Sequence, residues 1–409
     1  MKPLGPIPAG FRTDGGELLI GGQSAGALVK HAGGTPLFVY DRAMIAARFA
    51  DLRAVMPDRL SVHYAMKANP FPPLLKTMAE WVDGFDIASG GELALALAAG
   101  EAPGAISFAG PGKSDAELEA AIAAGITLNL ESAGELTRAL RTAERLGQRP
   151  RLAIRVNPAF DIRGSGMKMG GGAKPFGVDE EQVPGLLRGL LAAGAEWRGF
   201  HIYSGSQALD ADAVITAQAA TLALAADLAQ RAGVAVPHCN LGGGFGIPYF
   251  AGDTPLEIGA VGTALGEAFD RLPAVLAETE FAIELGRWLV GEAGVYLTRV
   301  LDVKHSHGEI FVVTDGGLHH QLAASGNFGT VVRRNYPVAL ANRFDAQPFE
   351  EPQNLVGRLC TPLDRLADKA ALPLAEPGDL VAVFCAGAYG ASASPSAFLG
   401  HGPAHEMLV

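Results

Sequence analysis

Short apolar runs alternate with amphipathic segments through the middle of the chain. Eight runs rich in β-branched and aromatic residues are predicted strands, over residues 60–66, 82–88, 105–109, 126–130, 151–156, 198–204, 236–241 and 280–285. The segments between them carry apolar residues at helical spacing, over residues 72–81, 91–99, 114–124, 133–146, 180–193, 210–232 and 255–276. Eight strands that alternate with helical segments in about 230 residues predict a closed parallel (β/α)8 barrel. An open doubly wound sheet is the alternative, but it usually contains fewer units.

The pattern changes after residue 285. Residues 295–304, 310–314 and 379–385 are predicted strands, separated by Gly, Pro and Asn, and residues 17–20 and 37–40 are predicted strands before the barrel. We therefore expect an α/β barrel over 41–287 and an all-β barrel or sandwich domain over 288–409. The N-terminal strands of residues 1–40 should complete that β domain.

Composition and charge exclude several functions. The 409 residues hold 32 Lys and Arg against 43 Asp and Glu, a net charge of -11 that disfavours nucleic acids and anionic membranes. Three widely spaced Cys do not form a disulfide framework, which indicates a reducing compartment. The N-terminus lacks the apolar core of a signal peptide, and the uncharged run 213–226 is too short and polar to span a bilayer. We expect a cytoplasmic protein.

The chemistry of such a barrel lies at the carboxyl ends of its strands, where the loops converge. Polar side chains occur at these positions in order along the chain: Lys67, Asp86, Tyr203 with Ser206, and Glu284 followed by Arg287. Ordinary surface residues would be scattered over both ends. The ordered placement predicts one active site at the carboxyl end.

Three of these positions suggest specific chemistry. Lys67 ends the first strand between apolar neighbours, so we expect a partly desolvated amine with a lowered pKa that forms a Schiff base. The glycine run 242–246 offers backbone N–H groups to a phosphate. Glu284 would face a cationic ring nitrogen while Arg287 holds an anion. An amine, a phosphate cradle and a carboxylate together suit pyridoxal 5'-phosphate.

Each position also has a simpler interpretation. Lys67 could reach the solvent at the barrel rim, the glycines could form a tight turn, and Glu284 could pair with Arg287. A dinucleotide or nucleoside triphosphate is not supported, because the glycine run matches neither fingerprint. His305, His307, His319 and His320 lack the further ligands of a metal site, so we expect no metal and place them at the surface or the rim.

The chain resembles the fold-type III pyridoxal-phosphate decarboxylases, the family of diaminopimelate and ornithine decarboxylases, over nearly its whole length. The matching motifs are YAMKAN at 64–69, FDIASGGEL at 85–93, RVNP at 155–158, KPFG at 174–177, GSQ at 205–207, GGGFG at 242–246, ELGR at 284–287, GRLC at 357–360 and GAY at 387–389. Their order and spacing carry the resemblance.

The resemblance implies roles for these residues. Lys67 would carry the coenzyme, Glu284 would bind the pyridine nitrogen, and Cys360 would protonate the carbanion in the partner chain's site after carbon dioxide leaves. The coenzyme pocket would further comprise Asp86, Ser206, Gly242, Gly243, Gly244, Gly286 and Tyr389, with Arg287 at either the phosphate or the substrate. The resemblance also implies a homodimer with shared active sites.

Departures from the family pattern bear on the substrate. Thr361 stands where relatives place the acidic residue that binds the distal amine of their substrate. The ring-stacking His of the family aligns with Tyr203, although His201 lies on the same side of the strand. Leu285 replaces the usual Pro, and the substrate-binding Arg and Tyr are only approximated by Arg333, Arg334 and Tyr336.

These departures resemble a divergent subgroup from exosortase-associated and carrier-protein-linked pathways. We expect an amino-acid substrate without a free distal ammonium, whether acidic, conjugated or carrier-linked. The alternatives are a genuine diaminopimelate decarboxylase, a racemase of the same fold, and a non-catalytic coenzyme carrier. Glu284 opposes the racemase, and the β domain with Cys360 opposes the carrier.

Overall fold

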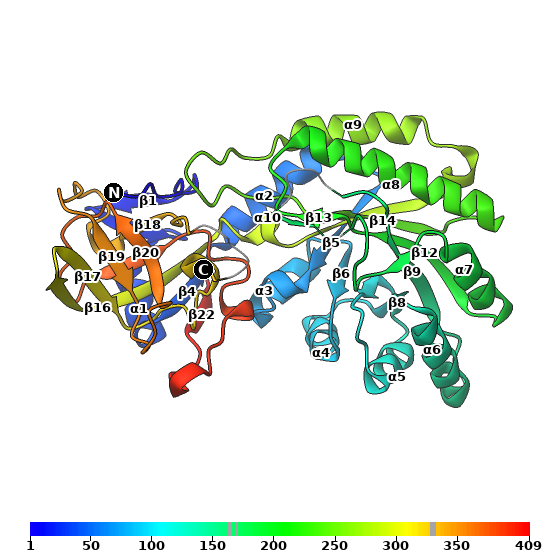
Figure 1. Ribbon diagram of the computed structural model, residues 1–409, viewed down its shortest axis with the longest axis horizontal. Helices are drawn as coiled ribbons and strands as arrows, with labels where there is room; N and C mark the ends of the chain where they lie inside the picture. The colour runs from blue at the N-terminus through cyan, green and yellow to red at the C-terminus, as the bar shows by residue number, and fades with distance from the viewer. Residues whose placement is uncertain (162–165, 169, 328–332) are drawn as a thin grey trace. The chain divides into compact units, whose positions relative to one another are not determined.

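The computed structural model describes residues 1–161, 166–168, 170–327 and 333–409 and divides into two compact units (Figure 1). Unit 1 comprises Met1–Phe49, Ile247–Pro255 and Arg287–Val409, and unit 2 comprises Ala50–Gly246 and Leu256–Gly286.

Unit 2 is a closed barrel of eight parallel strands, as predicted. Around the ring the strands run β5 (Leu60–Ala65), β6 (Gly84–Ile87), β7 (Ile106–Phe108), β8 (Thr127–Leu130), β9 (Arg151–Asn157), β12 (Glu196–Ile202), β14 (His238–Gly243) and β15 (Glu280–Leu285). Pairing of β8 with β9 and of β15 with β5 closes the ring, and the short β11 (Val178–Asp179) extends β9.

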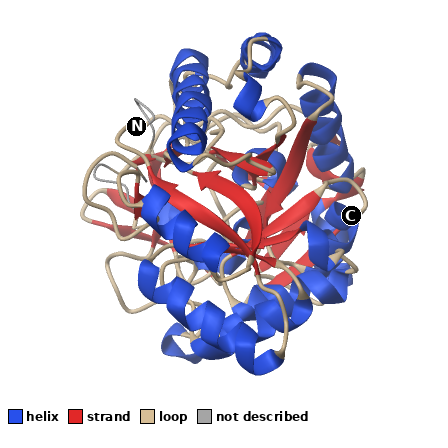
Figure 2. Ribbon diagram, turned by 90° about the vertical axis from the view of Figure 1, so that its right-hand side faces the viewer, coloured by secondary structure: helices blue, strands red, loops and turns tan. Residues whose placement is uncertain are grey.

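Helices surround the ring of strands (Figure 2). They are α3 (Pro72–Ala79), α4 (Gly90–Ala99), α5 (Asp115–Ala124), α6 (Ala133–Leu146), α7 (Val183–Ala192), α8 (Ala211–Ala232) and α9 (Ile258–Asp270). The bounds of α4, α5 and α6 follow from local chemistry, because each starts after a Ser whose hydroxyl accepts a backbone N–H and ends at a left-handed Gly. The pattern did not predict α1 (Ala25–Ala32) or α2 (Arg42–Val55).

The strands place their apolar and polar side chains on opposite faces. Buried apolar residues such as Tyr64, Phe85 and Ile283 alternate with polar residues such as His63, Asp86 and Glu284. The register pairs His63 with Glu284, so these side chains share one side of the sheet, and both belong to the polar set. The polar set includes the candidate site residues Asp86, His201 and Glu284, so the alternation positions the site.

Helix α8 is long and apolar enough to cross a membrane by those two criteria alone. Half of its most apolar stretch is buried in the protein, and it lies against α9, α7 and β14. Its apolar side chains are therefore those of a covering helix of the barrel.

Unit 1 is built on a mixed sheet in the order β18 (Val338–Leu340), β21 (Leu380–Val383), β16 (Gly294–Ser306), β17 (Glu309–Thr314), β19 (Gln353–Val356) and β20 (Arg365–Ala370). The predicted N-terminal contribution is confirmed, since β4 (Leu37–Tyr40) pairs with β16 and with β22 (His405–Leu408). A smaller sheet contains β1 (Arg12–Asp14), β2 (Glu17–Ile20) and β3 (Gln23–Ser24). The hydrophobic core of this unit includes Leu18, Leu37, Val295 and Leu380.

One surface prediction is wrong. His319 and His320 are buried, and His320 hydrogen-bonds the Tyr296 hydroxyl and the Gly402 carbonyl at 3.1 and 3.0 Å. A histidine pair in a loop carries no periodic pattern, so only the fold shows that this segment is covered. Among the described residues, no group of three or more His, Cys, Asp or Glu could hold a metal ion.

Candidate functional site

Glu284, at the carboxyl end of β15, is the centre of a buried polar cluster in unit 2. Its Oε2 lies 2.8 Å from His201 Nε2 and 3.4 Å from Asn240 Nδ2. Asn240 Nδ2 also lies 3.5 Å from Asp86 Oδ2. The four side chains come from β15, β12, β14 and β6, so barrel closure brings together residues up to 198 positions apart (284 minus 86).

The two carboxyl groups of this cluster are held in different states. Burial raises the pKa of Asp86 well above its usual value, and the neighbouring Glu284 raises it further. Burial alone would also raise the pKa of Glu284, but the charge and hydrogen bond of His201, with Lys67 and Asp86, lower it below its ordinary range. The directions of the two pKa shifts favour the protonated form of Asp86 and the carboxylate form of Glu284.

Lys67 lies in the single turn η1 (Met66–Ala68) that follows β5. Its Nζ is 5.6 Å from the centre of the Tyr203 ring, while His201 is committed to Glu284. The predicted desolvation is not observed, because the turn leaves Lys67 exposed although Met66 and Ala68 are buried. Gly286 permits this turn, since a Cβ there would lie 2.7 Å from the Ala68 Cβ.

The glycine run at the carboxyl end of β14 is a close-packed turn. A Cβ on Gly243 or Gly244 would lie 2.0 Å from the carbonyl oxygen of Glu284 or Gly205, respectively, so neither position admits a side chain. Ser206, in β13 (Gly205–Ser206), lies beside the run, with its Cα 3.3 Å from the position of a Gly244 Cβ. The Gly242 N–H already donates to Asn240 Oδ1 at 2.8 Å, so an anion would use other amides of the run.

In unit 1, Arg287 is surrounded by tyrosines. Its Nη1 donates to the Tyr249 hydroxyl at 2.7 Å, and its guanidinium carbon lies 4.6 Å from the centre of the Tyr389 ring. Tyr336 is buried against Tyr249, with ring centres 4.6 Å apart. Burial would lower the pKa of Arg287, but the tyrosines raise it, so the guanidinium is a permanent cation. Glu284 and Arg287 thus each have a hydrogen-bond partner within their own unit.

Cys360 is an exposed free thiol in the loop 357–364 of unit 1. Asp364 holds this loop, because its carboxylate accepts the N–H groups of Leu318 and Leu359 at 2.7 and 2.9 Å. Thr361 Oγ1 accepts the Leu363 N–H at 3.3 Å. All of residues 357–364 are described, and their one carboxylate, Asp364, is buried and directed at backbone donors.

Arg333 and Arg334 lie outside this loop. Arg333 Nη1 donates to the Arg365 carbonyl at 3.3 Å. Arg334 is exposed, stacks on Phe250 at 3.9 Å and lies 3.7 Å from Asp253. Tyr336 is therefore buried near Arg287, whereas the side chains of Arg333 and Arg334 are more exposed to solvent.

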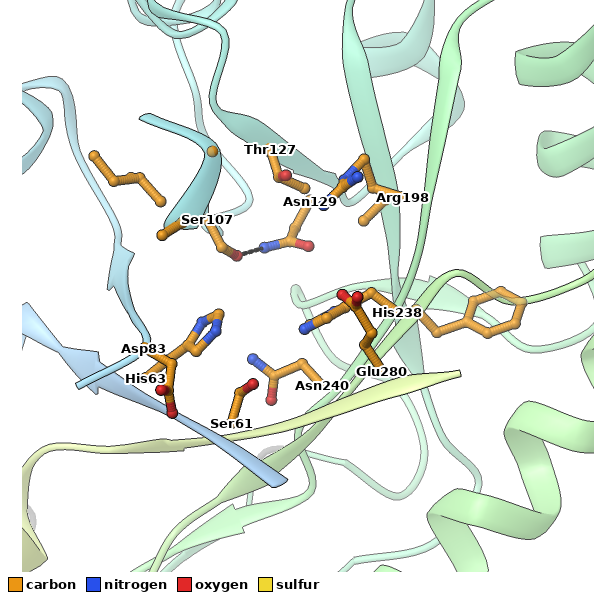
Figure 3. Close-up of a pocket in the computed structure, with 15 residues that line it drawn as sticks. Ser61, His63, Asp83, Ser107, Thr127, Asn129, Arg198, His238, Asn240 and Glu280 are labelled. Atoms are coloured by element: carbon orange, nitrogen blue, oxygen red, sulfur yellow. Dashed lines mark hydrogen bonds between the residues drawn. The ribbon is translucent and has the colours of Figure 1, made fainter. Parts of the chain in front are cut away.

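A polar cavity of about 180 Å³ occupies the amino-terminal ends of the barrel strands (Figure 3). His63, His238, Asn129 and Asn240 point into it, and Asn129 Nδ2 donates to Ser107 Oγ at 2.6 Å. Burial lowers the pKa of His63 to about 4 and that of His238 to about 3. This cavity lies away from Lys67, at the opposite ends of the strands.

The described residues of unit 2 fit pyridoxal phosphate. Lys67 supplies an amine, Tyr203 a flat ring, Glu284 a buried carboxylate kept ionised, and the glycine run a turn that excludes side chains. The sequence interpretation missed Asn240, Tyr249 and Asp364. An amide between Cys239 and Leu241 in an apolar strand was a usable signal for Asn240. Nothing local distinguishes Tyr249 or Asp364 from other polar residues.

Residues 42–291 match the family model of the pyridoxal-dependent decarboxylases, over the pyridoxal-binding domain. The L-glutamyl-[BtrI acyl-carrier protein] decarboxylase of Niallia circulans is 39% identical, over 91% of this chain and 88% of that protein. A diaminopimelate decarboxylase of Archaeoglobus fulgidus is 33% identical, over 98% of this chain and 93% of its own length. The 2-[(L-alanin-3-ylcarbamoyl)methyl]-2-hydroxybutanedioate decarboxylase of Staphylococcus aureus is 30% identical, over 89% and 91%.

Solved structures share the fold. The diaminopimelate decarboxylase of Helicobacter pylori, complexed with L-lysine, superposes with a TM-score of 0.83 at 28% identity, covering 94% of this chain and 93% of that one. The structure of AQ1208 from Aquifex aeolicus gives a TM-score of 0.82 at 31% identity, with 98% and 92% covered.

Proposed function

Because this chain belongs to the family of the pyridoxal-dependent decarboxylases, we propose that it decarboxylates an amino acid whose distal end carries no free ammonium. Pyridoxal phosphate, when bound, supplies the electron sink for loss of the α-carboxylate. The family and its relatives support pyridoxal-phosphate-dependent decarboxylation of an amino acid. The distal end of the substrate and the roles of individual residues are our proposal.

In this proposal the residues of unit 2 hold the coenzyme. Lys67 Nζ attaches it covalently, and Tyr203 stacks on its ring, because His201 is engaged with Glu284. Glu284 faces the ring nitrogen and keeps its proton in place, a role that needs the ionised state imposed by His201 and Asp86. Ser206 and the amides of Gly243 and Gly244 bind the phosphate.

The residues of unit 1 serve the same reaction. Arg287 binds an anionic group of the coenzyme or the substrate, together with Tyr389, and Tyr336 orients Arg287 through Tyr249. Cys360 Sγ would donate a proton to the Cα of the substrate after the carboxylate has left as carbon dioxide, in the site of a partner chain. We further propose that the enzyme is a cytoplasmic homodimer with shared sites.

The observation that carries the substrate proposal is that the loop 357–364, described throughout, offers no available carboxylate. Thr361 is neutral, and the Asp364 carboxylate is buried and already accepts two backbone N–H groups. This loop therefore offers no opposite charge to an ammonium group, which disfavours the free distal amine of diaminopimelate or lysine. A distal end that is acidic, acylated or joined to a carrier protein needs no such charge, and the Niallia circulans relative acts on a glutamyl group on a carrier protein.

Carbon dioxide release from the purified enzyme tests the proposal. The panel comprises meso-diaminopimelate, lysine, ornithine, arginine, glutamate, N-acylated diamines and a glutamyl thioester of pantetheine. We expect turnover to be fastest with an acidic, acylated or thioester substrate. Turnover of meso-diaminopimelate far above all others would instead identify a genuine diaminopimelate decarboxylase, the second candidate supported by the relative from Archaeoglobus fulgidus.

Borohydride reduction followed by peptide mapping tests the coenzyme site separately. We expect the label on Lys67. A label on another amine, or a protein that stays colourless after reconstitution, would contradict the assignment of Lys67.

A further inference from the structure

Asn240, in β14, connects two parts of the proposed coenzyme site through one side chain. Its Nδ2 lies 3.4 Å from Glu284 Oε2 and 3.5 Å from Asp86 Oδ2. Its Oδ1 accepts the N–H of Gly242, the first residue of the glycine run, at 2.8 Å. The residue is buried, with 2% of its surface exposed.

The orientation of this amide is determined by its neighbours. A backbone N–H can only donate, so the oxygen of Asn240 must face Gly242. The amino group must then face the two carboxyl groups, where it is the donor that a carboxylate requires. Glu284 Oε2 receives this donor in addition to His201 Nε2, so two contacts on one oxygen determine the rotation of the carboxylate.

Asn240 is also a wall of the polar cavity at the amino-terminal ends of the strands (Figure 3). His63, another lining residue, has its Nδ1 4.0 Å from Asp86 Oδ2. The cavity is therefore adjacent to the carboxyl pair, and its volume of about 180 Å³ suffices for several water molecules. The Asn240 side chain thus lies between this polar space and Glu284.

We infer that Asn240 is a positioning residue that orients Glu284 toward the ring nitrogen of the coenzyme and at the same time fixes the start of the phosphate-binding glycine run. This inference rests on the proposed coenzyme site. It assigns to one neutral amide the alignment of the ring end and the phosphate end of the same ligand.

The charges of the cluster explain why a neutral donor suits this position. Asp86 and Glu284 are both buried and both in reach of the Asn240 amide, so a third carboxyl group would add repulsion and a cation would compete for Glu284. An amide supplies a donor without adding charge. It also supplies the acceptor that the Gly242 N–H needs in a buried turn.

The test compares the variant N240L with the wild-type enzyme. Leucine has the same branched shape as asparagine but neither donor nor acceptor, so it removes both contacts without opening a void. Apoprotein is titrated with pyridoxal 5'-phosphate and, separately, with pyridoxal, which lacks the phosphate and reports on the ring end alone. We expect the Kd for pyridoxal 5'-phosphate to rise about ten- to a hundredfold, the range for losing a buried hydrogen bond to a charged group. The Kd for pyridoxal should rise less, because only the ring end contributes.

The variant N129L is the matched control. Asn129 lines the same cavity and is equally buried, but its amide donates to Ser107. We expect N129L to lower the thermal stability while leaving both Kd values within about twofold of wild type. If N240L does not fold, N240A replaces it in the same titrations.

The results separate the two proposals. If N240L or N240A leaves both Kd values and the visible absorption of the bound coenzyme unchanged, or if N129L alters them equally, the positioning role of Asn240 is refuted. If the wild-type enzyme itself fails to bind the coenzyme at Lys67, the proposed function fails instead.

Discussion

Thr361 is the single residue on which the substrate proposal depends most. Its neutral side chain hydrogen-bonds within its own loop, to the Leu363 N–H. An acidic residue at this position would add a charge that complements a distal ammonium. Whether the side chain at position 361 is neutral or acidic therefore determines which class of substrate we expect.

The variant T361E should shift the substrate preference toward free diamino acids. We expect the ratio of kcat/KM for meso-diaminopimelate to that for the best wild-type substrate to rise at least about tenfold, since the new carboxylate complements the charge of the distal ammonium. Carbon dioxide release measures both rates. T361Q, similar in size but neutral, should leave the ratio unchanged. An equal rise with both variants would show that size and not charge is responsible.

The loop 357–364 shows how an element is held by one side chain. Asp364 accepts the Leu318 and Leu359 N–H groups, and Gly317 and Gly357 leave room for its carboxylate, since a Cβ on either would lie 2.2 Å from a carboxylate oxygen. Two glycines and one aspartate therefore determine where Cys360 and Thr361 lie. The sequence shows that these three residues are present, but only the fold shows that they are in contact.

Replacing Asp364 by asparagine should loosen this loop. An amide offers one oxygen acceptor, so one of the two backbone N–H groups loses its partner, at a cost of about 1–3 kcal/mol in the free energy of unfolding. Denaturant unfolding followed by circular dichroism measures this loss, and turnover should fall with it. The exposed Asp345 of the same unit provides the control, and D345N should match the wild type. Equal stability of D364N and the wild type would contradict the role of Asp364 in holding the loop.

At the scale of the whole molecule, the buried histidines of the barrel couple stability to pH. The ordinary pKa of a histidine is about 6.5, whereas burial lowers the pKa of His63 in the folded protein to about 4. Between these values the unfolded state binds more protons, so stability falls as the pH drops from about 6.5 to about 4. His63 alone would contribute about 3 kcal/mol to this loss.

The variant H63Q should therefore flatten the acid side of the stability profile. We expect its free energy of unfolding to fall less than that of the wild type between pH 7 and pH 4, as measured by denaturant unfolding at each pH. H305Q removes an exposed histidine and should retain the wild-type profile. A profile for H63Q parallel to the wild type would exclude His63 as a source of acid sensitivity.

The proposed dimer with shared sites makes a second prediction at this scale. Lys67 and Cys360 would reach one site from different chains, so inactive K67A and C360A chains should complement each other when coexpressed. Half of a random mixture is hybrid dimers with one complete site in two, so roughly a quarter of the wild-type activity should return. Coexpression of K67A with E284Q should restore none, because both residues belong to the barrel. No recovery with C360A would argue against a shared site.

The eight-unit pattern and the ordered polar residues at the strand ends by themselves determined the barrel and most of the candidate site. This succeeded because strand alternation and helical periodicity are local, and because the carboxyl ends of parallel strands necessarily meet. The residues at these strand ends already suggested pyridoxal phosphate held by Lys67 and Glu284, and the resemblance then added the expected roles of Cys360 and Tyr389. The matches to the decarboxylase family support the coenzyme.

Only the tertiary structure decided how the charges of this site are shared. His201 hydrogen-bonds Glu284, and Lys67 is exposed. Arg287 contacts tyrosines of its own unit. The Asn240 amide lies between two carboxyl groups and the glycine turn. These facts depend on distances between residues far apart in the chain, and on burial, which together set pKa values and hydrogen-bond partners. The order of residues along a strand does not contain that information, because it is created when the sheet closes on itself.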